Sequence, residues 1–182
     1  VQNALSSLLT SASYDHVYRP QCVHRLDYAT EGVLLIGKHA QAIADLCQQF
    51  EMRSIRKSYF AVCAGDVPVE GRIEKPLDGL DAISLFERIH SLVSPKYGRL
   101  NLLRIVPQTG RRHQIRKHLE AIGHPILGDK IYGTPLTKQF GKGLYLFSQS
   151  ITFRHPITGE LQTIEASLTK KYRRLFPDLI NP

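Results

Sequence analysis

One acidic side chain in the segment CVHRLDYATEGVLL, residues 22–35, is a candidate for chemistry. Asp27 ends an Arg–Leu–Asp triplet and precedes an apolar run at residues 33–36, which is typical of a strand buried on both faces. Removing a carboxylate from water is costly unless a cation or hydrogen-bond donors compensate it. Asp27 is therefore either a reactive group with a buried partner or a turn-capping aspartate where a loop meets a strand.

The segment TGRRHQIRKHLEAIGHPILGDKIYG, residues 109–133, offers a partner for this carboxylate. On a helical wheel its apolar side chains form one stripe that is expected to be buried, made of Ile115, Leu119 and Ile122. Arg112 and Arg116 fall on the rim of that stripe, whereas His113 and Lys117 point away from it.

A guanidinium at the rim can bury its aliphatic stem and still bind a carboxylate or phosphate through two hydrogen bonds. Arg112 and Arg116 are therefore both candidates for binding a carboxylate or a phosphate. The alternative is that Arg116 makes an ordinary structural ion pair while Arg111 and Arg112 are merely exposed. The free N–H groups and the dipole at the start of this helix also favour an anion.

The histidines of this segment do not form a metal-binding pattern. His113 and His118 lie about 140° apart on a helix, and no cysteine or carboxylate stands at ligand spacing from them or from His124. The three cysteines are widely spaced, without a C-x-x-C pair, and fit core or incidental thiols of a reducing compartment; they are Cys22, Cys47 and Cys63. We expect no metal and no other cofactor.

The charge of the chain favours a polyanionic partner. Its 24 Lys and Arg residues exceed its 16 Asp and Glu residues, giving a net charge of +8 and a pI near 9.5. This balance fits binding to nucleic acid or to an acidic membrane surface, and it fits a solvated basic face without a partner equally well. No apolar run approaches the ~18–20 residues that span a bilayer. Residues 1–16 lack a secretory signal, so we expect a cytoplasmic monomer with no membrane contact.

The elements that would position these side chains seldom alternate between helix and strand. An amphipathic helix is predicted at 39–52, a strand in KSYFAVCAGDV at 57–67, and further strands at 71–75, 83–93 and 99–106. The helix that carries Arg116 should have Thr109 as its N-cap and Gly123 just after its end.

Two strands joined by a Pro/Gly hairpin are predicted in residues 144–166, and a short basic helix at 168–175 follows them. Strands outnumber helices. The sequence therefore predicts a single α+β domain, residues 1–182, with a mixed, mainly antiparallel sheet and flanking helices.

Several motifs stand in an order and spacing that together are highly specific: HRLDYATEG, KSYFAVCAG, DAISLF, TGRRHQIRKHL, GHPILGDKIYG and FRHPITGE. The set resembles the RluA/RsuA-type pseudouridine synthases, most closely the RluA branch, from about residue 18 to residue 166. The resemblance implies the pseudouridine-synthase fold with a central catalytic cleft, and RNA as the partner.

The resemblance also implies roles for individual residues. Asp27 matches the catalytic aspartate, Tyr59 the tyrosine that stacks against the target base, and Arg116 the arginine that pairs with the catalytic carboxylate. Arg25 matches an arginine that can occupy the space left by an extruded base. Without the other motifs, Tyr59 equally fits an ordinary core tyrosine on an alternating strand.

Contacts with RNA are expected mainly at phosphates, which favour basic side chains. The candidates are Lys57, Arg111, Arg112, His113, Lys117 and Lys130. A second basic cluster at residues 170–174 fits an RNA contact and a solvated tail equally well.

The chain departs from the family pattern in three places. Thr30, Glu31 and Gly32 stand where Thr-Ser-Gly is usual, and Arg112 replaces the threonine of Gly-Arg-Thr-His. The early family strand with an Asn-Lys-Pro segment is not recognisable, and no separate S4-type RNA-binding domain is expected.

The expected activity is the isomerisation of uridine to pseudouridine in ribosomal or transfer RNA, with Asp27 acting on a flipped-out base. Asp27 could act as a nucleophile at C1′ or as a base at the 2′ carbon, and the sequence leaves both open. One alternative is a catalytically silent RNA-binding or ribosome-assembly module with the same fold. A hydrolase that uses Asp27 is weaker, because no second carboxylate stands at a recognisable spacing.

Overall fold

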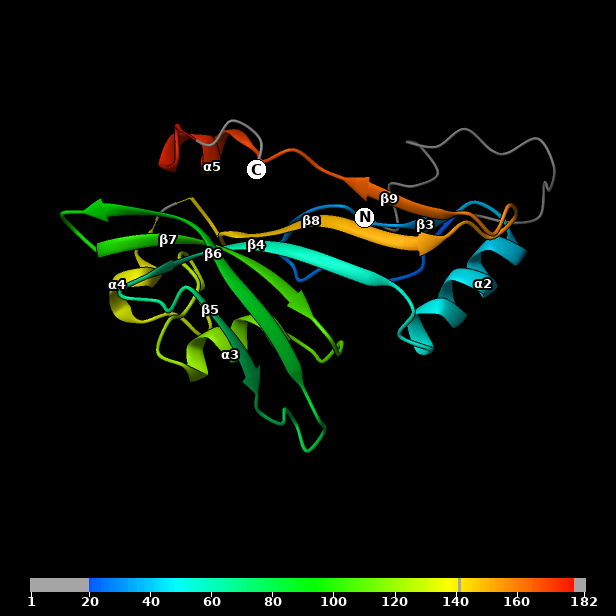
Figure 1. Ribbon diagram of the computed structural model, residues 1–182, viewed down its shortest axis with the longest axis horizontal. Helices are drawn as coiled ribbons and strands as arrows, with labels where there is room; N and C mark the ends of the chain where they lie inside the picture. Colours follow the sequence, from blue (N-terminus) through cyan, green and yellow to red (C-terminus); the bar gives the residue numbers. More distant parts are fainter. Residues whose placement is uncertain (1–19, 141, 179–182) are drawn as a thin grey trace.

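A seven-stranded sheet forms the centre of the protein in the computed structural model, which describes residues 20–140 and 142–178 (Figure 1). The strands are β2 (Glu31–Gly32), β4 (Arg56–Ala64), β5 (Glu70–Glu74), β6 (Ile83–Ser94), β7 (Gly98–Pro107), β8 (Leu146–Arg154) and β9 (Leu161–Glu165). Their order is β2-β8-β4-β7-β6-β5. Strand β9 also pairs with β8, at residues 150–154, which follow the residues that pair with β2. Within this sheet β2 and β8 are parallel, and the other pairs are antiparallel. A separate two-stranded ribbon joins β1 (Gln21–Cys22) to β3 (Ile36–Gly37).

Helices cover different parts of this sheet. In Figure 1, α2 (Ala40–Glu51) lies at one end of the long β4–β8 pair, while α3 (Gln114–Ala121) and α4 (Pro135–Lys138) lie toward the other end. The short helix α5 (Lys170–Leu175) follows β9. The α+β class with a mixed, mainly antiparallel sheet is thus confirmed.

Strand β4 passes through the main hydrophobic core. Four consecutive residues, Phe60, Ala61, Val62 and Cys63, are at most 2% exposed, because β4 pairs with β7 on one side and β8 on the other and packing covers both of its faces. Leu119 of α3 and Tyr172 of α5 belong to the same core. A second, smaller core joins Leu46 of α2 to Ile151 and Phe153 of β8.

Most predicted elements are confirmed within one to three residues. The helix predicted at 39–52 is α2, and its apolar spacing places Leu46 in the second core. The strands predicted at 71–75, 83–93 and 99–106 are β5, β6 and β7. The hairpin β8–β9 and the helix α5 also lie where they were predicted. No helix in residues 20–140 and 142–178 is long and apolar enough to cross a membrane.

Two local predictions were wrong. The apolar run at 33–36 is not a buried strand: residues 33–35 are half-buried and extend between β2 and β3. Thr109 is not the N-cap of α3, because the helix begins five residues later, after His113. The Thr109 hydroxyl instead accepts a hydrogen bond from the Ile83 N–H and donates one to Gln114 Oε1. Gly123 does follow the helix end, with a positive φ of 81°.

A glycine allows the chain to approach β8 closely at β2. Gly32 has a φ of 115°, and a Cβ added there would lie 2.1 Å from the main-chain oxygen of Ser148. That oxygen also accepts a hydrogen bond from the Val33 N–H at 2.9 Å. Any side chain at residue 32 would therefore push this segment away from the sheet.

We expect Gly32→Ala to lower the free energy of unfolding by at least about 3 kcal/mol, because backbone strain and overpacking act together. Gly79→Ala is the matched control: its φ is 77° and no atom lies within 4 Å of the added Cβ, so it should cost only about 1–2 kcal/mol. Urea unfolding of both variants measures the difference. Equal losses would show that Gly32 is not in close contact with β8.

Candidate active site

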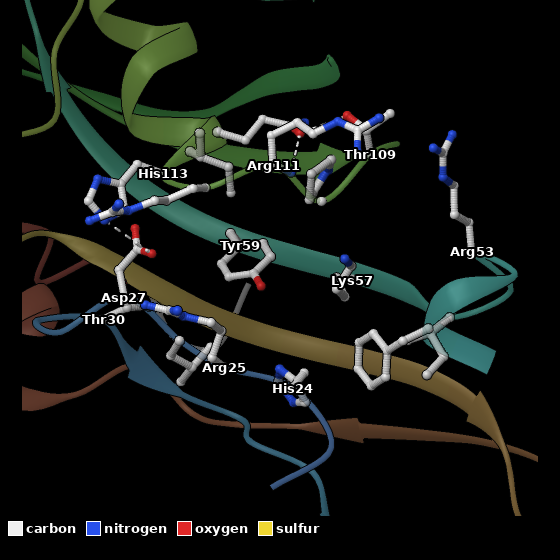
Figure 2. A pocket seen from close by; sticks show the side chains of 18 of the residues that line it. His24, Arg25, Asp27, Thr30, Arg53, Lys57, Tyr59, Thr109, Arg111 and His113 are labelled. Carbon is white, nitrogen blue, oxygen red and sulfur yellow. Dashed lines mark hydrogen bonds and ion pairs between the residues drawn. The ribbon is translucent and has the colours of Figure 1, made fainter. Parts of the chain in front are cut away.

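Four chain segments form most of the wall of a cleft of about 680 Å³. They are the loop at 23–30, the end of α2 with the residues that follow it (50–55), strand β4, and the loop at 107–113 that leads into α3. Figure 2 shows Asp27 and His113 at one end of this cleft, Tyr59 and Lys57 along β4, and Arg53 at the other end.

Asp27 lies near the surface of the cleft rather than deep inside it. Its side chain is 20% exposed, and its main-chain oxygen accepts a hydrogen bond from the Thr30 N–H in a tight turn. Its Oδ2 atom lies 3.5 Å from Arg116 Nη1, and its Oδ1 atom lies 3.9 Å from His113 Nε2. The expected contact with Arg116 is present, but it is long for a charge-assisted hydrogen bond.

The principal partner of Arg116 is a second carboxylate. Its Nε and Nη2 atoms donate to Asp129 Oδ2 and Oδ1 at 2.7 and 2.8 Å, which is the two-pronged geometry of a strong pair. The Arg116 side chain is 8% exposed and that of Asp129 is 0% exposed. The Asp129 hydrogen bond raises the pKa of Arg116, which stays cationic.

Asp129 is itself held by the main chain. Its Oδ1 atom accepts hydrogen bonds from the N–H groups of Ile131 and Tyr132 at 2.9 and 3.0 Å. Burial acts to raise the pKa of this carboxyl, but the hydrogen bond from Arg116 and the two N–H groups outweigh it, and the net pKa is lowered. Arg116 therefore sits between a fixed buried anion and the more exposed Asp27.

His113 faces the cleft, contrary to the wheel that pointed it away from the buried stripe. It adopts left-handed backbone geometry, with a φ of 54°, and therefore precedes α3 rather than continuing it. Its Nδ1 atom lies 3.0 Å from the Tyr132 hydroxyl. Burial lowers the pKa of His113 more than the Asp27 charge raises it, so the ring is neutral at pH 7 and its 3.9 Å contact with Asp27 is not an ion pair.

The loop before α3 is fixed by one buried glutamine. Gln114 Oε1 accepts hydrogen bonds from the Thr109 hydroxyl and the Arg111 N–H. Its Nε2 atom donates to the main-chain oxygen of Ile83 and to the Ser84 hydroxyl on β6. The Gln114 side chain thus fixes the loop at 107–113 to the sheet, and α3 begins only at Gln114.

Tyr59 places its ring in the cleft next to Asp27 (Figure 2). Burial raises the pKa of Tyr59 to about 12, and the negative charge of Asp27 contributes, although a hydrogen bond with Ser148 acts the other way. The side chain is therefore an uncharged phenol at physiological pH. It adds a flat aromatic face without a second negative charge.

The departure at Thr30-Glu31-Gly32 has a structural explanation. Glu31 binds Lys171 of α5 at 2.6 Å and accepts a hydrogen bond from the Thr169 hydroxyl at 3.2 Å. Lys171 also donates to the main-chain oxygen of Leu144. The glutamate thus ties the segment that follows Asp27 to the C-terminal helix.

The structure brings most predicted site residues together. The lining of the cleft includes Asp27, Tyr59, Arg25, Lys57, Arg111, Arg112 and His113. Arg116 lies behind this lining and contacts Asp27. Two candidates do not line it. Lys117 binds the exposed Asp78 at 2.9 Å, and Lys130 donates to the main-chain oxygen of Lys138. Ile122, expected in the buried stripe, is 36% exposed at the end of α3.

The sequence analysis missed several residues of this site. Asp129, Tyr132, Gln114 and His24 all support or line the cleft. A signal for Asp129 was present in the motif GHPILGDKIYG, whose acidic residue precedes an aromatic one, but its partner lies 13 residues away in sequence. Within residues 20–140 and 142–178, no three His, Cys, Asp or Glu side chains gather as metal ligands.

Comparison with known proteins places this arrangement in a family. Residues 4–121 match the family model of the RNA pseudouridylate synthases. The chain belongs to the RNA pseudouridylate synthase family. Members of that family are isomerases, and the resemblance inferred from the motifs is confirmed.

Two bacterial relatives illustrate the match. The tRNA pseudouridine synthase C of Haemophilus influenzae is 33% identical over 84% of this synthase and 76% of its own length. The dual-specificity RNA pseudouridine synthase RluA of Escherichia coli is 33% identical over 88% of this chain and 78% of its own.

Solved structures agree on the fold. Human RNA Pseudouridylate Synthase Domain Containing 4 has a TM-score of 0.75 at 18% identity, covering 98% of this chain and 81% of its own. Human RNA Pseudouridylate Synthase Domain Containing 1 has a TM-score of 0.72 at the same identity.

Arg116 and Asp27 should differ sharply in their effect on stability. We expect Arg116→Met to lower the free energy of unfolding by about 3–5 kcal/mol, because it leaves the Asp129 carboxylate buried without its cation. Asp27→Asn should cost less than about 1 kcal/mol, because Asp27 is partly exposed and its one close contact is long. Urea unfolding measures both, and a loss at Asp27 as large as that at Arg116 would contradict this assignment.

His24 should make stability depend on pH. Burial lowers the pKa of His24 to about 4, the charge of Lys57 adds to this, and Nε2 accepts the Leu35 N–H at 2.9 Å. Between about pH 6.5 and about pH 4, His24 is therefore protonated in the unfolded chain but neutral in the folded protein. The free energy of unfolding is highest above about pH 6.5 and falls by up to about 3 kcal/mol as the pH decreases toward about 4.

The matched variant is His24→Gln, whose amide oxygen still accepts the Leu35 N–H but does not titrate in this range. Urea unfolding at about pH 7.5 and about pH 4.5 should show a smaller difference for the variant than for the wild type. The same difference in both proteins would remove His24 from the acid sensitivity.

Proposed function

We propose that this synthase isomerises uridine to pseudouridine in transfer or ribosomal RNA, with Asp27 as the catalytic carboxylate acting on a flipped-out base. The observation that carries the proposal is the position of Asp27: it lies in a cleft beside Tyr59, 3.5 Å from a guanidinium that a buried carboxylate holds in place. The printed names of the relatives, a tRNA synthase and a dual-specificity RNA synthase, support the choice of RNA.

The reaction breaks the N1–C1′ bond of uridine, turns the base, and joins C5 to C1′. The proton on C5 then leaves to solvent and N1, freed from C1′, takes up a proton from solvent, so the product has the same composition as the substrate. A carboxylate next to the ribose serves both routes to this product, as a nucleophile at C1′ or as a base that removes the proton from the 2′ carbon. In either route Asp27 must be ionised at the start.

Arg116 places a positive charge beside the Asp27 carboxylate. Because Asp129 occupies its Nε and Nη2 atoms, the remaining Nη1 points to Asp27. The guanidinium is therefore already in place when the Asp27 carboxylate reacts and when its charge is restored, and preorganised charge of this kind is an effective source of catalysis.

Tyr59 provides the platform for the base. Moving a uridine out of its stack in the RNA costs a few kcal/mol of free energy. Stacking of the base on an aromatic side chain offsets this by about 1–3 kcal/mol. The neutral phenol of Tyr59 adds no charge that would oppose the anionic Asp27.

Cations around the cleft account for the attraction of RNA. Arg25 and Arg112 line the cleft and form no ion pair with another residue of the described ranges, so their charges are available to phosphates. Arg111 donates its Nε to the main-chain oxygen of Asp81, which leaves its terminal nitrogens for RNA.

Tritium release from RNA labelled at C5 of uridine tests the proposal. Wild-type protein should release tritium from transfer or ribosomal RNA transcripts, and Asp27→Asn should lower the rate by at least about a thousandfold, because it removes the reacting group. Asp66→Asn is the matched control, since Asp66 is 95% exposed and does not line the cleft.

A catalytically silent RNA-binding module makes a different prediction. It would bind the transcripts but release no tritium in either form. Release at equal rates by wild type and Asp27→Asn would leave the isomerase assignment possible but remove Asp27 from its mechanism.

A further inference from the structure

The cleft is longer than one target base requires. A uracil fills roughly 240 Å³ if each of its eight heavy atoms takes about 30 Å³, the volume of a water molecule, against a cleft of about 680 Å³. Beyond Tyr59, Figure 2 shows Lys57 and then Arg53, and Phe50 lies beside Lys57 in the lining. This second end of the cleft is formed by β4, by the end of α2 with the residues after it, and by His24, and no step of the isomerisation uses it.

Lys57 is a cation of this second end that lacks an anionic partner. It stands two residues before Tyr59 on β4, so both side chains point to the same face, about 7 Å apart along the strand. Its ammonium group makes no ion pair or hydrogen bond with another residue of 20–140 and 142–178, although its main chain pairs with Ile151 of β8. Burial lowers the pKa of Lys57.

The wall beside Lys57 is aromatic and uncharged. The rings of His24 and Phe50 stack with centroids 4.9 Å apart, and the Lys57 Nζ lies 5.8 Å from the centre of the Phe50 ring. His24 is neutral at physiological pH because its pKa is about 4. Glu51, the acidic residue lining this end, is exposed and forms no ion pair with Lys57.

One free cation beside an uncharged aromatic wall has the chemistry of a nucleotide site. A phosphate would give the Lys57 ammonium the anion it lacks, and an aromatic wall suits a sugar and base. The distance along β4 is short enough for a single nucleotide step from a base that rests on Tyr59. Arg53 at the rim adds a second positive charge.

We propose that the end of the cleft formed by Lys57, Phe50 and His24 is a second subsite, which binds the nucleotide next to the target uridine with Lys57 Nζ on its phosphate. The proposal rests on the proposed function, since it takes the neighbouring base on Tyr59 to be the target. It makes Lys57 and Phe50 determinants of substrate recognition, with no part in the chemical step.

The first test couples Lys57 to a single phosphate. RNA stem-loops carrying a modified uridine are made with one neutral methylphosphonate at a time on either side of that uridine, and pseudouridine formation is followed with wild type, Lys57→Met and Lys96→Met. Lys96 is exposed in the turn between β6 and β7 and does not line the cleft.

At one of the two flanking phosphates, the methylphosphonate should lower kcat/KM of the wild type roughly 10- to 100-fold, as should Lys57→Met on normal RNA. Combining the two changes should lower it little further, because they remove the same contact. With Lys96→Met the methylphosphonate should keep its full effect. Two results would overturn the subsite. In one, Lys57→Met and the methylphosphonate lower kcat/KM by independent factors that multiply, whichever flanking phosphate is replaced. In the other, Lys57→Met leaves kcat/KM unchanged.

The second test does not need activity. Binding of a fluorescent oligouridylate is measured by anisotropy over a range of salt concentrations. Lys57→Met should reduce the salt slope by about one, and Lys57→Arg should preserve it. Phe50→Leu, which keeps an apolar side chain but removes the ring, should weaken binding roughly tenfold with an unchanged slope. Slopes equal to the wild type in Lys57→Met would refute the phosphate contact.

The two proposals fail in different ways. If the wild type makes no pseudouridine in any RNA but Lys57→Met still lowers the salt slope, the isomerase function is wrong and the phosphate site stands. If the wild type is active and Lys57→Met changes neither kcat/KM nor the slope, the function stands and the subsite is wrong.

Discussion

The site depends on one arginine that is shared by two carboxylates. Arg116 is almost fully buried, and a buried guanidinium is stable only when its donors are satisfied. Asp129 satisfies Nε and Nη2, and the main-chain N–H groups of Ile131 and Tyr132 in turn fix Asp129. The Nη1 atom then has a fixed direction, toward the loop that carries Asp27. The ion pair between Arg116 of α3 and Asp129 of the following segment therefore fixes the direction of the donor that contacts Asp27.

Asp27 is less buried than the Arg116–Asp129 pair beside it. Its side chain is neither deeply buried nor tightly bound, so its desolvation is modest. The costly burial falls on Asp129, which is fully covered and fully hydrogen-bonded. The same arginine thus contacts one fully buried aspartate and one that faces the cleft. Asp27 is free to interact with a substrate while its cation remains in place.

The regular elements could be predicted because their signals are local. The apolar spacing of α2 and the β-forming run of β4 each reflect burial along a single segment. The loops around the cleft could not be predicted in this way. His113 leaves the helical path because Gln114 binds β6, some 30 residues away in sequence. Residues 33–35 run without strand pairing because Gly32 and Val33 are held at Ser148 and the Leu35 N–H binds His24.

The same contrast separates the cations. Lys117 and Lys130 looked equivalent to Lys57 and Arg112 in the sequence, but the fold binds the first two to Asp78 and to a main-chain oxygen. Arg25, Lys57 and Arg112 line the cleft without an ion pair in the described part of the chain. Only the three-dimensional structure shows which positive charges are already used. The three that remain free line the same cleft as Asp27 and Tyr59.

The most direct measurement of this account is the single-turnover rate of pseudouridine formation by Asp129→Asn, together with its affinity for the same RNA. Asparagine still accepts the Ile131 and Tyr132 N–H groups but no longer balances the guanidinium, so Arg116 should lose its fixed direction. The rate should fall roughly 10- to 100-fold while the Kd for RNA changes less than about twofold. A folded Asp129→Asn protein that reacts at the wild-type rate would contradict the claim that Asp129 positions Arg116 for Asp27.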